Sequence, residues 1–137
     1  MSGLQTRTYT LAGQAFTAGT FVNISQLMGS SQSTTNPEGM TKVVRISLSA
    51  TPQQDSATDG VSIFKFAGDG VSVQQIFAGP GWSNQAAGPL GGNDGQPVVM
   101  ENSAGLFDII PGNQIDFSAS CTTAETCDVA ISITYSA

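Results

Sequence analysis

Apolar and polar residues alternate along several segments of the chain, which is the pattern of β-strands with one buried face. Residues 6–11 alternate in this way, with Arg7, Tyr9 and Leu11 on one side and three threonines on the other. Residues 42–50 give the clearest example. Their two expected faces are Val44, Ile46, Leu48 and Ala50 on one side, and Val43, Arg45, Ser47 and Ser49 on the other.

Turn residues separate these segments from further expected strands. Residues 61–67 and 71–77 flank Gly68-Asp69-Gly70, which is a hairpin signal. Residues 98–101 and 106–110 also predict strands, and a turn follows at residues 111–114. The segments expected to be loops are residues 29–39, 51–59 and the long, glycine- and proline-rich 79–97.

The C-terminal region predicts a closing hairpin. If Cys121 lies opposite Cys127, the same register pairs Phe117 with Ile131, and every apolar side chain falls on one face. Directly opposed residues in such a hairpin have Cα atoms about 4.5 Å apart, at the short edge of disulfide geometry. A disulfide between Cys121 and Cys127 and a pair of buried free thiols are both compatible with this arrangement.

These elements predict an all-β fold. We expect about eight short antiparallel strands that form a two-sheet sandwich, specifically a jelly roll. Residues 1–12 are expected to be an N-terminal arm or an edge strand, and residues 13–137 a single β-sandwich domain.

Composition excludes several classes of function. The chain of 137 residues has ten acidic and four basic residues, a net charge of −6 and no histidine. Catalytic triads and metal sites that use histidine are therefore excluded. Four basic residues are too few for a nucleic-acid-binding surface. We expect no membrane partner, because no apolar run approaches the roughly 18 residues of a membrane span. We also expect no secretory signal at the N-terminus.

No catalytic, cofactor-binding or metal-binding residues are predicted. A Ser–Lys dyad would need Lys42 or Lys65, and both lie within expected strands without a nucleophile motif. The aspartates occur mainly in turns, where Asp-Gly has a structural explanation. Residues 91–95 contain one calcium-repeat-like element, which a tight turn explains equally well. We therefore predict that the protein is not an enzyme.

The sequence resembles the small, β-rich capsid decoration (cement) proteins of tailed bacteriophages. The resemblance lies in the start MSGLQTRTYT, the body rich in Ser, Thr, Gln and Gly, and the ending FDIIPGNQIDFSASC…CDVAISITYSA. It implies a jelly roll or related barrel without catalytic activity. It also implies a homotrimer that binds major capsid protein on the outside of the virion, after a period in the host cytoplasm. The N-terminal arm, with Gln5, Arg7 and Tyr9, is the expected docking segment, because such arms often extend a neighbour's sheet.

Phe77 and Trp82 are further candidates for partner contact. Trp82 is the only tryptophan, and it lies in the long glycine- and proline-rich segment. It could anchor a partner or cap the end of the core. The alternative function is a carbohydrate-binding or receptor-binding β-sandwich, such as a lectin or fibre-tip module. That alternative would require Trp82 and Tyr9 to be exposed on one concave face.

Overall fold

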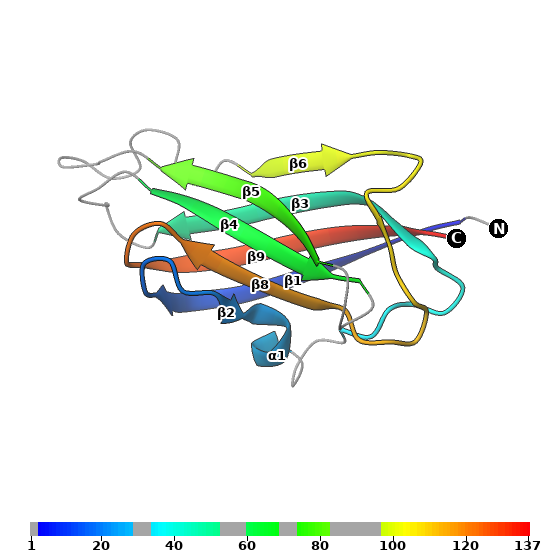
Figure 1. Ribbon diagram of the computed structural model, residues 1–137, viewed down its shortest axis with the longest axis horizontal. Coiled ribbons are helices and arrows are strands. Elements are labelled where there is room, and N and C mark those ends of the chain that lie inside the picture. Colours follow the sequence, from blue (N-terminus) through cyan, green and yellow to red (C-terminus); the bar gives the residue numbers. More distant parts are fainter. Residues whose placement is uncertain (1–2, 29–33, 53–59, 69–73, 83–96) are drawn as a thin grey trace.

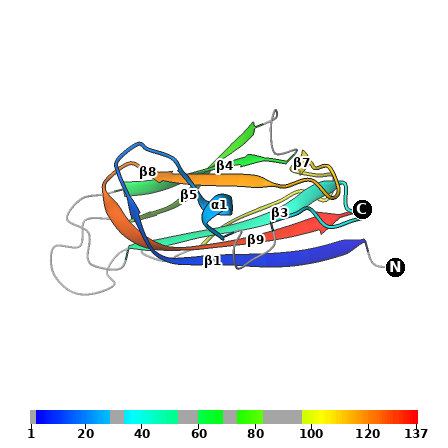
Figure 2. The ribbon, with the colours of Figure 1, turned by 90° about the horizontal axis from the view of Figure 1, so that it is seen from below.

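The chain folds into two antiparallel sheets that face each other, as its computed structural model shows (Figure 1). The structure describes residues 3–28, 34–52, 60–68, 74–82 and 97–137. Figure 2 shows the sheets as two layers, with α1 between β8 of one layer and β1 of the other. The elements are β1 (Leu4–Phe16), β2 (Val22–Asn23), α1 (Ile24–Met28), β3 (Lys42–Pro52), β4 (Gly60–Ala67), β5 (Gln74–Trp82), β6 (Val98–Glu101), β7 (Phe107–Asp108), β8 (Asp116–Cys121) and β9 (Glu125–Ser136).

The order of the strands makes this sandwich a jelly roll. Sheet A has the order β1-β9-β3-β6, with β7 also paired to β3, and sheet B has the order β2-β8-β4-β5. The first long strand pairs with the last, β2 pairs with β8, and β4 with β5 forms a hairpin. The chain is thus a long antiparallel ribbon rolled into two layers, which is the jelly-roll arrangement. The predicted fold class is confirmed.

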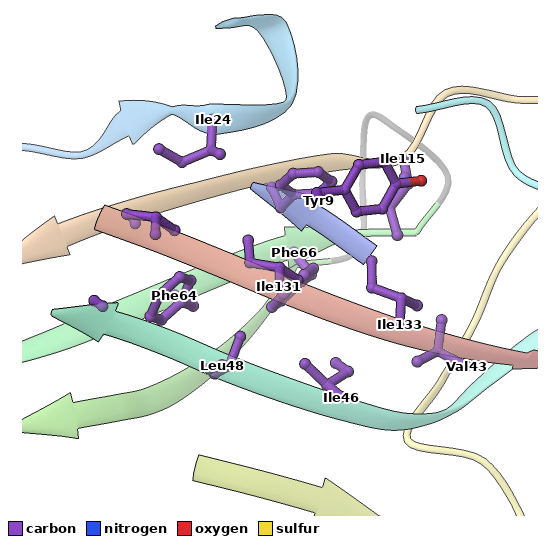
Figure 3. Packing of buried hydrophobic residues seen from close by; sticks show 14 of the residues in the cluster. Tyr9, Ile24, Val43, Ile46, Leu48, Phe64, Phe66, Ile115, Ile131 and Ile133 are labelled. Atoms are coloured by element: carbon purple, nitrogen blue, oxygen red, sulfur yellow. The ribbon is translucent and has the colours of Figure 1, made fainter. Parts of the chain in front are cut away.

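The core lies between the two sheets and is filled from both sides. Figure 3 shows Ile46 and Leu48 of β3 and Ile131 and Ile133 of β9 in this cluster, together with Phe64 from sheet B. These side chains are fully buried, because each strand turns every second residue inward. Aromatic rings join the two layers, because the ring centroid of Phe66 in sheet B lies 5.9 Å from that of Phe107 in sheet A. The alternation read from the sequence therefore identifies most of the core.

One departure from strict alternation occurs at the start of β3. The register of β3 against β9 shifts between Val43 and Arg45, which marks a β-bulge. The bulge buries both Val43 and Val44, although alternation places them on opposite faces. The expected grouping of Val43 with Arg45, Ser47 and Ser49, which are only partly buried, therefore does not hold.

The predicted closing hairpin is also wrong, although its buried faces are right. Strand β8 pairs with β4 and β2 in sheet B, whereas β9 pairs with β1 and β3 in sheet A. The inward residues Phe117 and Ile131 both belong to the core, but they come from opposite sheets. Alternation determines which face of a strand is buried and leaves open which strand lies beside it.

The polar segment after α1 is partly buried in spite of its composition. Asn36 is buried, and its Nδ2 donates hydrogen bonds to the carbonyl oxygens of Gly68 (2.9 Å) and Ile110 (3.0 Å). Thr35 forms an isolated bridge with Gln114. These contacts join three segments that are distant in the sequence. Part of the expected loop is therefore ordered by hydrogen bonds to the rest of the fold.

The structure changes one other expectation about loops. Residues 79–82 continue strand β5, where Trp82 pairs with Gly60. Residues 69–73, which include part of the expected hairpin turn and of the strand expected after it, lie outside the described residues, as do residues 83–96 of the long glycine- and proline-rich segment. The pairing of β4 with β5 on either side of that turn is confirmed.

Candidate contact surfaces

The outer side of sheet A is covered mainly by hydroxyl groups. Because Tyr9, Ile131 and Leu48 face the core, their neighbours along each strand face outward. We call this surface the hydroxyl face, and its residues are Thr6, Thr8, Thr10, Ser47, Ser49, Ser132 and Thr134. Exposed apolar side chains lie only at its margins in the described structure, with Leu4 at the start of β1 and Val99 on β6.

Hydrogen bonds order the hydroxyl face across the β1–β9 pair. Thr6 Oγ1 lies 2.9 Å from Thr134 Oγ1, and Thr8 Oγ1 lies 2.9 Å from Ser132 Oγ. Each pair is directly opposed in the strand register. Such neutral cross-strand pairs need no counter-ion, which suits a surface with few charges.

A shallow hollow of about 400 Å³ lies at one end of the hydroxyl face. Its one carboxylate, that of Asp128, accepts a hydrogen bond of 2.9 Å from the backbone N–H of Gly13. The hollow is lined by Thr10, Leu11, Ala12, Ser49, Thr51, Asp128, Val129 and Ala130. A single carboxylate among hydroxyl and methyl groups does not provide the paired acids that glycoside hydrolysis requires.

The outer side of sheet B is different, because it carries large apolar side chains. Ile76 is 66% exposed and Phe21 is 39% exposed. Ile63 and Ala78 are opposed in register and also turn outward, since Phe64 and Phe77 face inward. We call the surface made by Phe21, Ile63, Lys65, Ile76 and Ala78 the apolar face.

Lys65 supplies a positive charge in the middle of the apolar face. It is opposed to Ile76 on one side and to Ser118 on the other. Its Nζ lies 4.5 Å from the centroid of the Phe21 ring. This distance is typical of a cation–π contact, which holds the ammonium group above the ring while its stem covers the sheet.

The apolar residues of this face, Phe21, Ile63, Ile76 and Ala78, were not among the sequence candidates, although a signal was present. In residues 61–67, Phe64 and Phe66 occupy one parity and Ile63 the other. A strand with large apolar residues on both parities has apolar residues on both faces. That pattern could have indicated that the outer side of this strand is a contact surface.

Tyr9 is not at the surface, contrary to the expectation that it contacts a partner. It is 2% exposed, and its ring centroid lies 5.2 Å from that of Phe117 in the opposite sheet. Figure 3 shows it within the core near Ile115. Tyr9 therefore connects the edge strand β1 to the core. Its burial also removes the concave aromatic surface that a carbohydrate-binding role would need.

The other proposed contact residues are placed differently from one another. Gln5 is exposed on β1, where it opposes Tyr135 of β9. Arg7 is partly buried, and its Nη1 donates a hydrogen bond to the carbonyl oxygen of Thr35. Phe77 is partly buried, with its ring centroid 5.9 Å from that of Phe66. The side chain of Trp82 lies outside the described structure. The structure therefore does not gather these candidates into one site.

Cys121 and Cys127 meet inside the sandwich from opposite sheets. Both are buried free cysteines in the core cluster. A hydrogen bond from the thiol of Cys127 lowers the pKa of Cys121. The same hydrogen bond, together with burial, raises the pKa of Cys127.

The described residues hold no group of three or more His, Cys, Asp or Glu side chains that could bind a metal ion. Residues 91–95, which carry the calcium-like element, lie outside them. Lys42 and Lys65 are both partly buried on strands, and Lys65 contacts Phe21. Among the described residues, no helix has the length and apolar character needed to cross a bilayer.

Comparison with known proteins gives distant likenesses. No protein-family model and no curated protein matches the chain. A structure of Desmodium yellow mottle tymovirus is similar over 100% of this chain and 89% of its own, with 10% identity and a TM-score of 0.39. A coat protein dimer of Tobacco streak virus is similar over 96% of this chain and 86% of its own, with 13% identity and a TM-score of 0.32. Such low scores carry no argument, so the fold assignment rests on the strand order itself.

Proposed function

We propose that this chain is a non-enzymatic structural protein of a virus particle. It binds the outside of the capsid between major capsid subunits and stabilises the shell. The observation that carries the proposal is the apolar face, with Ile76 66% exposed beside Phe21 and Lys65. Contiguous exposed apolar side chains of this kind mark interaction surfaces on soluble domains.

The charge of the chain indicates what the apolar face meets. The whole chain has a net charge of −6, whereas this face centres on the cation Lys65. A facing surface should therefore offer apolar side chains around a carboxylate, which would pair with Lys65 when water is excluded. We assign this role to the major capsid protein.

The hydroxyl face supports the proposal from the opposite side of the molecule. Its paired hydroxyl groups form hydrogen bonds with one another. Such a surface can face solvent on the outside of a particle without attracting other particles. A homotrimer would engage the shell at several points, so each contact could be weak while the total binding is strong.

Co-sedimentation with purified empty capsids of the encoding virus tests the proposal. Ile76→Asp is expected to reduce retention on capsids at least tenfold, because it places a carboxylate on the apolar face of an acidic protein. Thr8→Asp is the matched control, since it adds the same charge at an exposed strand position on the hydroxyl face. Its retention should equal that of the unmodified chain.

Equal retention of both variants would contradict a role for the apolar face. Absence of retention for the unmodified chain, together with a monomer by light scattering, would contradict the structural role itself. Turnover of generic ester or glycoside substrates by the purified protein would contradict its non-enzymatic character.

A further inference from the structure

We propose that Cys121 and Cys127 form a peroxide-sensitive thiol pair whose disulfide fastens sheet A to sheet B. This inference is independent of the proposed function, because it rests on the interior of the sandwich. The sequence contains two cysteines, and the fold brings both to one place. The resulting bond would join the two layers of the jelly roll covalently.

The position of the pair allows the bond to form. Cys121 ends β8 in sheet B, and Cys127 lies near the start of β9 in sheet A. Facing sheets pack about 10 Å apart, which is too far for a disulfide between most opposed residues. Here the chain crosses between the sheets in residues 122–124, and the two thiols are already in hydrogen-bond contact. The two thiols are therefore neighbours before any bond forms.

Two turns close the end of the sandwich over the pair. The backbone N–H of Gly19 donates a hydrogen bond of 2.8 Å to the carbonyl oxygen of Cys121. Thr122 and Ala124 of the β8–β9 connection are exposed, while both cysteines are buried. A small oxidant needs only a local opening of these turns, whereas a bulky thiol reagent needs a larger one. The pair is therefore suited to hydrogen peroxide.

The chemistry proceeds in two balanced steps. The thiolate of one cysteine attacks one peroxide oxygen, so an S–O bond forms, the O–O bond breaks, and hydroxide leaves. The sulfur of the other cysteine then attacks the sulfenic sulfur, so an S–S bond forms and the S–O bond breaks, and its thiol proton leaves with the hydroxyl group as water. Overall, two thiols and one hydrogen peroxide give one disulfide and two water molecules. Sulfur is oxidised and the peroxide oxygens are reduced.

The contact between the two thiols allows either of them to resolve the other. Cys121 and Cys127 are hydrogen-bonded to each other and are both buried. Whichever sulfur is oxidised first therefore has its partner beside it, so the sulfenic acid is converted to a disulfide within the chain.

The first experiment needs no mutation. The reduced, folded chain is treated with hydrogen peroxide and examined by intact mass, non-reducing electrophoresis and thermal melting. We expect the loss of two hydrogen atoms, a monomeric band, and a Tm raised by several degrees, on the order of 5 °C. Dithiothreitol should reverse all three. A folded chain that stays reduced under conditions that oxidise the urea-unfolded chain would overturn the proposal, as would an unchanged Tm.

The second experiment tests the need for both thiols. Cys127→Ser and Cys121→Ser each leave one cysteine without a resolving thiol, so a sulfenic acid should accumulate there and react with dimedone. The unmodified chain is the control and should be labelled several-fold less, because its second thiol consumes the sulfenic acid. If either serine variant fails to fold, the corresponding alanine variant replaces it. Labelling of the unmodified chain equal to that of the variants would overturn the proposal.

Discussion

The two outer faces of this sandwich differ although both belong to antiparallel sheets that cover the same core. The hydroxyl face of sheet A presents threonine and serine pairs such as Thr8 with Ser132. The apolar face of sheet B presents Ile76 and Phe21 around Lys65. Inner packing requires nothing of these outward residues, because alternate residues already fill the core. Under the proposed function, their chemistry differs because one face meets water and the other meets the capsid.

The largest effect on stability is expected from a substitution in the core that both faces share. Phe66 contacts rings from both sheets, with its centroid 5.9 Å from those of Phe77, Phe107 and Phe117. Phe66→Ala should lower the free energy of unfolding by about 3–5 kcal/mol, measured by urea denaturation. Ile76→Ala on the adjacent strand is the control and should change it by about 0.5 kcal/mol or less. A loss below about 1 kcal/mol for Phe66→Ala would show that the layers are not held by this aromatic cluster.

A smaller effect is expected from overpacking beneath the apolar face. A Cβ added at Gly79 would lie 2.5 Å from Phe64 Cε1 and from Ser62 Oγ, closer than packed atoms allow. Gly79→Ala should therefore cost about 1–3 kcal/mol of stability and displace the strand that carries Ile76. Ala78→Ser, one position away on the outward side, should be nearly neutral. Thermal melting of both variants checks this, and equal melting temperatures would contradict the close packing.

The comparison also shows how far the sequence predicts the fold. The alternation in residues 42–50 and 127–135 predicts the buried faces of β3 and β9, because burial follows side-chain parity. Strand partners are not predicted, since Phe117 and Ile131 share parity whether they pair edge to edge or face each other across a core. The bulge that buries Val43 depends on the register with β9, which is a tertiary property.

The contact surfaces were predicted less well than the fold, for a physical reason. The sequence alone does not show whether an aromatic residue on a strand faces the core or the solvent. Tyr9 was therefore expected at the surface, and the structure places it against Phe117. The hydroxyl character of β1 was visible in its three threonines, whereas the apolar face requires β4, β5 and the segment before β2 to come together.

A smaller effect on stability is expected from the cation–π contact at the centre of the apolar face. Lys65 and Phe21 form a cation–π pair at the surface, so a double-mutant cycle with Lys65→Met and Phe21→Leu should give a coupling of about 0.5–1 kcal/mol. The coupling should decrease as salt is added, because exposed charges are screened. Unfolding curves at low and high salt measure it. A coupling energy of zero at low salt would contradict a cation–π contact between Lys65 and Phe21.

The equivalent cycle on the hydroxyl face should give the smallest effect and respond differently to salt. Thr8 and Ser132 share a hydrogen bond of 2.9 Å between exposed hydroxyl groups. A cycle with Thr8→Val and Ser132→Ala should give a coupling of roughly 0.2–0.5 kcal/mol, because water competes for both groups. Since neither hydroxyl is charged, the coupling should stay constant between low and high salt. A salt-dependent value here would mean that charge, rather than neutral hydrogen bonding, organises the hydroxyl face, and the contrast between the two faces would then fail.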